Sequence, residues 1–187
     1  MNGSHVILGV TGSIAAYKSA DLVVDMVKAG AEVTVIMTES ARRFVAPLTF
    51  ETLSQRPAIV DMWDRTQAPG PVHVRLAEWA DLLVVAPATA SFIGKLAHGI
   101  ADDILSCMAI SVECPTVIAP AMNDVMYRHP AVKANVALLK KRGCAIIGPA
   151  RGRLASGKTG VGRLAPSDKI LDAVRLALPR KRARQKR

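Results

Sequence analysis

Short apolar runs alternate with segments of helical periodicity along almost the whole chain. Apolar runs without alternating polar residues indicate strands that are buried on both faces. Strands and helices that alternate with short links predict a parallel sheet covered on both sides. We therefore expect an α/β fold, a Rossmann-like (flavodoxin-like), doubly wound parallel sheet with three α/β/α layers. The predicted strands are residues 5–10, 32–37, 81–86, 116–119 and 144–147, with a short one at 58–60.

The predicted helices lie between these strands. In the first of them, Ala20, Val23, Val24 and Val27 have the spacing of one helical face, and Gly30 follows as a stop signal. The expected helices are residues 15–29, 39–45, 74–79, 92–108, 131–142 and 167–178. Residues 54–71 and 151–163 are expected to be less regular, because turn residues and glycines are frequent there.

The chain length of 187 residues fits one domain, which we expect to span residues 1–178. Residues 179–187 contain six Lys and Arg residues, which predicts a disordered basic tail. Leaving out these six charges lowers the net charge from +10 to +4. No aromatic residues interleave with the charges, so nucleic acid is not the expected partner. A solvated tail and a tail that touches an anionic surface both stay open.

No apolar run reaches the roughly 18 residues that a membrane-spanning helix needs, so a membrane partner is not expected. The amino terminus has no basic segment followed by an apolar one, unlike a secretory signal. Cys107, Cys114 and Cys144 are odd in number and lack the spacing of metal ligands. We therefore expect a cytoplasmic protein with free thiols and without a bound metal.

Small and polar residues follow four of the predicted strands. Gly12 and Ser13 follow the first strand, Thr38 and Ser40 the second, and Asn123 the fourth. The carboxyl ends of parallel strands meet at one edge of the sheet, where such sheets bind their ligands. The glycine turn favours a phosphate over a merely tight turn, and Ser40 can also cap a helix. Residues 87–91, which end the third strand, suit either a flat ring or an ordinary helix start.

Two side chains are candidates for chemistry. His73 suits proton transfer near neutral pH, although a capping or surface role stays open on the residues alone. Asn123 can hydrogen-bond a carboxylate or a flavin edge without adding charge. The glycine-rich loop 151–163 is typical of a functional segment in a compact domain. Its basic residues suit a phosphorylated substrate or a solvated loop equally; they are Arg151, Arg153, Lys158 and Arg163.

Four segments together resemble the flavin-dependent cysteine decarboxylases (HFCD flavoproteins). They are residues 9–18, His73 with 86–90, 120–127, and 154–163. The resemblance covers residues 6–170 and is strongest to the branch that acts on phosphopantothenoylcysteine in coenzyme A synthesis. It implies FMN as the cofactor, held by Gly12, Ser13, Ile14, Thr38, Ser40, Thr89, Ala90, Ser91 and Ala121. It implies catalytic roles for His73, Asn123 and Ser156, and substrate contacts from Asn123, Met126, Arg153 and Ala155.

The resemblance also implies a reaction and an assembly. The substrate thiol is oxidised by hydride transfer to the flavin, carbon dioxide leaves, and the enethiol is reduced to phosphopantetheine. His73 would assist thiol oxidation, and Asn123 would orient the carboxylate. Family members form homotrimers, some of them dodecamers, with the site completed between subunits. A separate phosphopantothenate–cysteine ligase is a further candidate partner.

Two residues depart from the family pattern. Ser156 replaces a cysteine that donates a proton when the enethiol is reduced, and a serine hydroxyl is a far poorer acid than a thiol. Ser91 replaces an asparagine, although it can still hydrogen-bond. Three alternatives therefore stay open. The alternatives are a peptidyl-cysteine decarboxylase that releases an enethiol, a flavin-binding regulatory protein without turnover, and a reductase of another small molecule.

Overall fold

The computed structural model describes residues 1–63 and 70–179, and it confirms the predicted parallel sheet. Five strands lie in the order β2-β1-β3-β4-β5, and all neighbouring strands are parallel. This order is that of flavodoxin-like, doubly wound sheets. The strands are β1 (His5–Val10), β2 (Glu32–Met37), β3 (Leu82–Ala88), β4 (Thr116–Pro120) and β5 (Ala145–Ile146).

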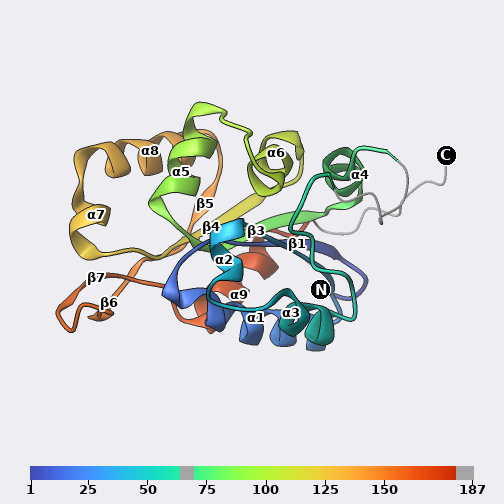
Figure 1. The fold of residues 1–187 in the computed structure, drawn as a ribbon, viewed down its shortest axis with the longest axis horizontal. Helices are drawn as coiled ribbons and strands as arrows, with labels where there is room; N and C mark the ends of the chain where they lie inside the picture. The colour runs from blue at the N-terminus through green and yellow to red at the C-terminus, as the bar shows by residue number, and fades with distance from the viewer. Residues whose placement is uncertain (64–69, 180–187) are drawn as a thin grey trace.

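Helices cover both faces of the sheet (Figure 1). One face packs against α1 (Lys18–Lys28), α3 (Pro47–Ser54) and α9 (Ser167–Ala177). The other packs against α4 (Val72–Trp79), α5 (Ala90–His98), α6 (Ile104–Ser111) and α8 (Pro130–Lys141). Alternate residues of β1 enter the two cores, Leu8 the first and Ile7 the second. The three-layer α/β/α architecture is therefore as predicted.

Short helices follow the carboxyl ends of three strands. The 3-10 helix η1 (Ile14–Tyr17) follows β1, α2 (Glu39–Arg42) follows β2, and α7 (Asp124–Arg128) follows β4. From β1 the chain moves outward to β2 and then returns to place β3 on the other side of β1. The strand order reverses between β1 and β3, and ligands of such sheets bind outside the carboxyl ends at this reversal.

The prediction of one helix over residues 92–108 was wrong. α5 ends before Gly99, whose φ of 70° is left-handed, and α6 begins after its N-cap, Asp103. Asp103 and Ser106 form a capping box, because each side chain accepts the backbone N–H of the other. Lys95 fixes the break through ion pairs of 2.6 Å to Asp102 and 2.9 Å to Asp103. Apolar residues on both sides of the break continue the helical pattern, so periodicity alone does not reveal it.

The segment predicted to be irregular at 151–163 instead forms an antiparallel hairpin of β6 (Ala150–Arg153) and β7 (Thr159–Arg163). Alternating glycines and basic residues do not look like a strand, because no apolar side chain marks a buried face. The predicted strand at 58–60 is a single bridge between Ile59 and Ile36. Helices α3 and α7 were not predicted.

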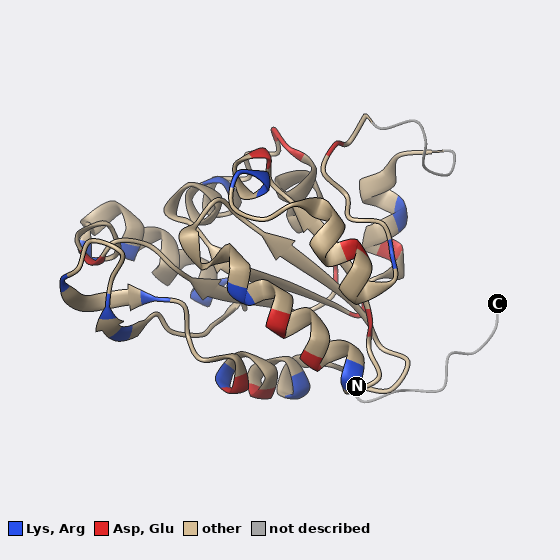
Figure 2. Cartoon of the chain, turned by 60° about the horizontal axis from the view of Figure 1, so that its bottom comes forward, with Lys and Arg blue, Asp and Glu red and all other residues tan. Residues whose placement is uncertain are grey.

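The hairpin is a basic surface. Residues 150–163 include four Lys and Arg residues and no Asp or Glu, and Lys and Arg are seen along this part of the chain in Figure 2.

Among the described residues, none of the helices is long and apolar enough to cross a bilayer. From residue 180 onward the predicted basic tail lies outside the described residues, so the boundary between domain and tail stays a prediction.

Candidate functional site

Backbone hydrogen bonds join the carboxyl ends of four strands. The N–H of Thr38 donates to the Val10 carbonyl at 3.0 Å, which joins the ends of β2 and β1. The N–H of Ala121 donates to the Ala88 carbonyl at 3.0 Å, which joins the ends of β4 and β3. Thr11, directly after β1, contacts the end of β3 through its hydroxyl. The turns that the sequence singled out therefore form one connected edge.

Four polar residues of this edge are helix N-caps. The side chains of Ser13, Thr38, Thr89 and Asn123 each accept a backbone N–H of the helix that follows, at 2.9–3.4 Å. The capping role that the sequence left open for Ser40 belongs to Thr38 instead. Because helix amino termini have partial positive charge, this edge favours anionic groups.

Gly12 is required by a close approach. A Cβ atom at this position would overlap the Cβ of Ser40, so the turn after β1 lies directly against the start of α2. Ser40 and Ser91 are exposed, and Ser13 is half-buried. Glycine backbone and neutral hydroxyl groups at helix starts fit the phosphate of a nucleotide-like cofactor. The residues present at the strand ends thus fit FMN.

A cleft of about 190 Å³ opens beside these turns. It joins three segments that are far apart in the sequence: the start of η1, the turn after β4, and the turn between β6 and β7. The lining residues are Ser13, Ile14, Ala15, Ala121, Met122, Asn123, Leu154, Ala155, Ser156, Gly162, Arg163 and Leu164. Six residues that the sequence assigned to the site lie on this cleft, namely Ser13, Ile14, Ala121, Asn123, Ala155 and Ser156.

The β6–β7 hairpin packs tightly on the turn after β4. The N–H of Met122 donates to the Gly162 carbonyl at 2.9 Å. A Cβ at Gly162 would overlap the Met122 carbonyl oxygen, and a Cβ at Gly160 would lie 2.8 Å from the Cβ of Asp124. Two glycines of β7 therefore allow the hairpin to approach the segment that contains Asn123.

The side chain of Asn123 is oriented by its own helix. Its Oδ1 accepts the N–H of Val125 at 2.9 Å, which fixes the amide plane and leaves the amide nitrogen as the donor. This residue is exposed at the cleft, where the NH₂ group can donate to a carboxylate. Met126 is three residues after Asn123, and Arg153 directly precedes Leu154 of the cleft. Both are exposed, but neither lines the cleft.

Six lining residues were not assigned to the site from the sequence: Ala15, Met122, Leu154, Gly162, Arg163 and Leu164. Leu154 and Leu164 give the cleft buried apolar walls, and Arg163 is the ionisable residue among the described residues that line it. The sequence marked Arg163 as basic but favoured Arg153 as the substrate contact. No local pattern marks Arg163, because neighbouring residues of a strand face opposite sides and its place depends on how the hairpin packs on the β4 turn.

His73 is not near Asn123 within one chain. It is the second residue of α4, half-buried, and absent from the cleft lining. In Figure 1, α4 lies on the side of the molecule opposite the β6–β7 hairpin. The structure therefore does not bring His73 and Asn123 together within one chain.

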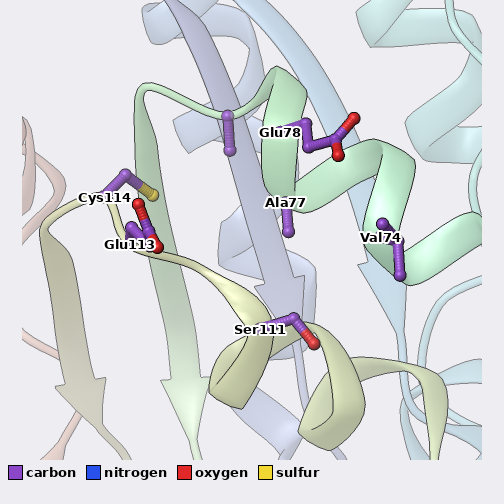
Figure 3. Close-up of a pocket in the computed structure, with 7 residues that line it drawn as sticks. Val74, Ala77, Glu78, Ser111, Glu113 and Cys114 are labelled. Atoms are coloured by element: carbon purple, nitrogen blue, oxygen red, sulfur yellow. The ribbon is translucent and has the colours of Figure 1, made fainter.

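A larger pocket of about 440 Å³ lies between α4, the end of α6 and the start of β4 (Figure 3). Its side chains include Glu78, Ser111, Glu113 and Cys114. Cys114 and the other cysteines are free thiols, as predicted. Burial raises the pKa of the Cys114 thiol, so it is less reactive than an ordinary thiol. The pocket adjoins the amino end of β4, away from the ligand-binding edge, and the described residues contain no cluster suited to a metal.

Comparison with known proteins decides the family. A family model described as Flavoprotein matches residues 1–178. The chain belongs to the flavoprotein family. Among curated relatives, the coenzyme A biosynthesis bifunctional protein CoaBC of Bacillus subtilis is 49% identical over 172 residues, which are 91% of this chain and 42% of that protein. The CoaBC of Mycobacterium tuberculosis H37Rv is 44% identical over 94% of this chain and 42% of its own length.

Solved structures of flavoproteins agree with this assignment. A cysteine-to-serine mutant of PPC decarboxylase, complexed with pantothenoylaminoethenethiol, has a TM-score of 0.82 and 32% identity, over 94% of this chain and 98% of its own. The FMN-dependent cysteine decarboxylase SpaF has a TM-score of 0.78 and 35% identity, over 91% and 97%. The resemblance to flavin-dependent cysteine decarboxylases is confirmed. The chain spans about two-fifths of the length of the curated relatives it matches.

Proposed function

We propose that this flavoprotein is an FMN-dependent carboxy-lyase that decarboxylates the cysteine moiety of phosphopantothenoylcysteine. The observation on which this rests is the cleft, in which the η1 turn, Asn123 and Ser156 meet at the switch point of the sheet. The CoaBC relatives are named for coenzyme A biosynthesis, and a PPC decarboxylase has the same fold over nearly the whole chain. These comparisons support the small-molecule substrate.

We assign cofactor binding to the strand-end turns. Gly12, Ser13 and Ile14 would hold the phosphate side of FMN, with hydroxyl groups from Thr38 and Ser40 nearby. The remaining contacts would come from the turns after β3 and β4, through Thr89, Ala90, Ser91 and Ala121. Bound FMN supplies a hydride acceptor, so that the thiol carbon of the substrate can become the electron sink that decarboxylation needs.

The protein's own residues would position the leaving carboxylate. Asn123 donates a neutral hydrogen bond, which orients the carboxylate without the strong stabilisation that a cation would give to its charge. Leu154, Leu164 and Ala121 are buried walls that exclude water. Since carbon dioxide is neutral, removing water from the carboxylate disfavours the starting state more than the product. Arg163 lines the same cleft and would attract a phosphorylated substrate.

His73 would reach the cleft from a neighbouring subunit, where its imidazole would take or give a proton during thiol oxidation. This requires at least a second copy of the chain, and we propose that the assembly is a homotrimer or a dodecamer. Met126 and Arg153, exposed beside the cleft, would contact the substrate once it is closed in. Free half-buried cysteines fit the reducing cytoplasm, where we place the protein. A ligase activity that joins phosphopantothenate to cysteine must supply the substrate, as the bifunctional CoaBC relatives suggest.

A second candidate function is favoured by Ser156. Its exposed hydroxyl lies on the cleft where a thiol donor would be expected, and Cys107, Cys114 and Cys144 are not among the lining residues. A decarboxylase that stops at an enethiol, including one that acts on a peptidyl cysteine, needs no such donor. A flavin-binding regulatory protein without turnover has no comparable support, because the cleft retains Asn123.

One experiment separates these functions. The purified, FMN-loaded protein is incubated anaerobically with phosphopantothenoylcysteine, and the flavin absorbance and product mass are followed. Bleaching and recovery, with a product lighter by carbon dioxide alone, are the expected result for the complete decarboxylase. Persistent bleaching, with a product lighter by carbon dioxide and two hydrogens, indicates a reaction that ends at the enethiol. Unchanged flavin and substrate would contradict the proposal and favour a peptide substrate or a binding protein.

A further inference from the structure

Two buried hydroxyl groups hold the end of β3 where its regular pairing stops. The register between β3 and β4 shifts between Val85 and Ala88. At this irregularity the Ala86 carbonyl accepts a hydrogen bond of 2.7 Å from the Ser19 hydroxyl. The Pro87 carbonyl accepts one of 2.7 Å from the Thr11 hydroxyl. Hydroxyl groups from α1 and from the residue after β1 thus bond the last carbonyls of β3.

Thr11 does more than satisfy one carbonyl. Its hydroxyl oxygen also accepts the backbone N–H of Thr89 at 3.0 Å, and its own N–H lies 3.3 Å from the Pro87 carbonyl. Thr89 in turn caps α5 by accepting the N–H of Phe92. One hydroxyl group therefore sets both the direction of the chain after β3 and the position of the first turn of α5.

The two sides of this bond belong to different cofactor turns. Thr11 immediately precedes Gly12 and Ser13 in the turn after β1, whereas Thr89 begins the turn after β3. These turns flank the point where the strand order reverses. A planar cofactor that contacts both turns would be sensitive to their separation, and the Thr11–Thr89 bond fixes that separation.

Both hydroxyl groups lie in apolar surroundings. Thr11 is 1% exposed and Ser19 is fully buried, and most of their neighbours in the first core are aliphatic. A valine at position 11 would have the same shape and would suit the end of a buried strand. Threonine is therefore favoured over valine at position 11 by the hydrogen bonds of its hydroxyl, since a buried polar group without partners is destabilising.

We propose that Thr11 and Ser19 are positioning residues of the flavin site: their hydroxyl groups fix the end of β3 so that the turns at Gly12–Ile14 and Thr89–Ser91 are spaced to hold the cofactor. This inference rests on the proposed function, because it assumes that FMN binds at these turns. Thr11 has the larger role, since it bonds the cofactor turn itself, whereas Ser19 anchors the strand further back.

The test compares substitutions of matched shape. Thr11→Val removes the hydroxyl, and Thr11→Ser keeps it. Thr34→Val is the control, because Thr34 is also a buried strand threonine, 3% exposed, whose hydroxyl accepts a hydrogen bond from Arg56 Nε at 2.9 Å. Thr34 lies in β2 and does not line the cleft. The Kd for FMN is measured by flavin fluorescence on the apo-proteins, and unfolding by urea is measured in parallel.

We expect Thr11→Val to raise the Kd about tenfold, the effect of losing one well-placed buried hydrogen bond. Thr11→Ser should stay within about threefold of the native Kd, because the hydroxyl is retained. Thr34→Val should lower stability to a similar extent and leave the Kd within about twofold. A spectrum of bound flavin that loses its fine structure in Thr11→Val, but not in Thr34→Val, would add support.

Equal Kd values for Thr11→Val and Thr34→Val would overturn the proposal and leave Thr11 a purely structural residue. If Thr11→Val does not fold, Ser19→Ala decides, with an expected increase of about threefold in the Kd. An unchanged Kd in that variant would contradict the role of the pair. Failure of the native protein to bind FMN at all would instead contradict the proposed function.

Discussion

Met122 donates its backbone N–H to the carbonyl of Gly162 at 2.9 Å, and this bond joins the β6–β7 hairpin to the turn that contains Asn123. Both ends of the contact belong to the cleft lining. The hairpin therefore forms one wall of the site, and its distance from the sheet is set by glycines whose missing side chains leave room for a carbonyl oxygen.

Gly162→Ala should detach the hairpin. The added methyl group would overlap the Met122 carbonyl, so the hydrogen bond must break or the hairpin must shift. We expect turnover to fall at least about tenfold, since the cleft loses a wall. Gly94→Ala, within α5, is the control. Its added Cβ would lie an ordinary 3.6 Å from Nδ2 of Asn135 in α8, and the stability of α5 should rise slightly. Native turnover in Gly162→Ala would show that the tight contact is dispensable.

His73→Asn and Asn123→Asp should complement one another. The first variant lacks a titrating group, and the second repels the substrate carboxylate, so each alone should be inactive. After mixing under conditions that exchange subunits, some interfaces combine a native His73 with a native Asn123, and partial turnover should return. Exchange is verified by the mass of assemblies built from tagged chains. A verified mixed assembly without turnover would contradict a site that combines His73 of one subunit with Asn123 of another.

Ser156→Cys should change the product. A thiol at this position can donate the proton that a serine hydroxyl cannot release near neutral pH. If the native chain stops at the enethiol, the variant should yield the saturated amide, heavier by two hydrogens, while Ser156→Ala should behave like the native chain. The product mass after anaerobic turnover distinguishes them. Saturated product from both the native chain and Ser156→Ala would show that the proton comes from elsewhere.

Lys95→Met should weaken the break between α5 and α6 in a pH-dependent manner. The hydrogen bond from Lys95 holds the pKa of Asp102 below its ordinary value. A lowered folded-state pKa stabilises the fold above the unfolded pKa of about 3.9, and this stabilisation is lost as the pH falls through the folded value. Urea unfolding should thus separate Lys95→Met from the native chain at pH 7, and the difference should shrink progressively as the pH is lowered below about 4. Lys133→Met, an exposed control, should differ little at any of these pH values; a constant difference for Lys95→Met would argue against an electrostatic cause.

The sheet could be predicted from the sequence because its strands are continuous apolar runs, such as residues 5–10 and 116–119, that are buried on both faces. The break in residues 92–108 could not be found by periodicity, because Ile104 and Leu105 resume the apolar pattern after Gly99. The local signals were Gly99 and the Asp103–Ser106 capping box. Helix stop and cap residues were thus more informative there than the spacing of apolar residues.

The lining of the cleft was predictable where single turns contribute to it, as at Ser13 and Asn123. It was not predictable where the lining depends on how the hairpin packs on the sheet. Arg163 and Leu164 enter the cleft because Gly162 meets Met122, a contact between residues 40 positions apart. The separation of His73 from Asn123 likewise follows from the place of α4 in the fold, which no local pattern contains.

The hairpin also separates two properties that evolution can alter independently. The turns at the strand ends arise from the sheet itself, whereas the turn at residues 154–158 is attached to it through β6 and β7. Changes in the length or composition of that turn alter one wall of the cleft, whereas the hydrogen bonds that join the strand ends lie within the sheet. If the proposed function holds, a lineage can exchange one substrate for another through this wall and keep the cofactor contacts that the sheet provides.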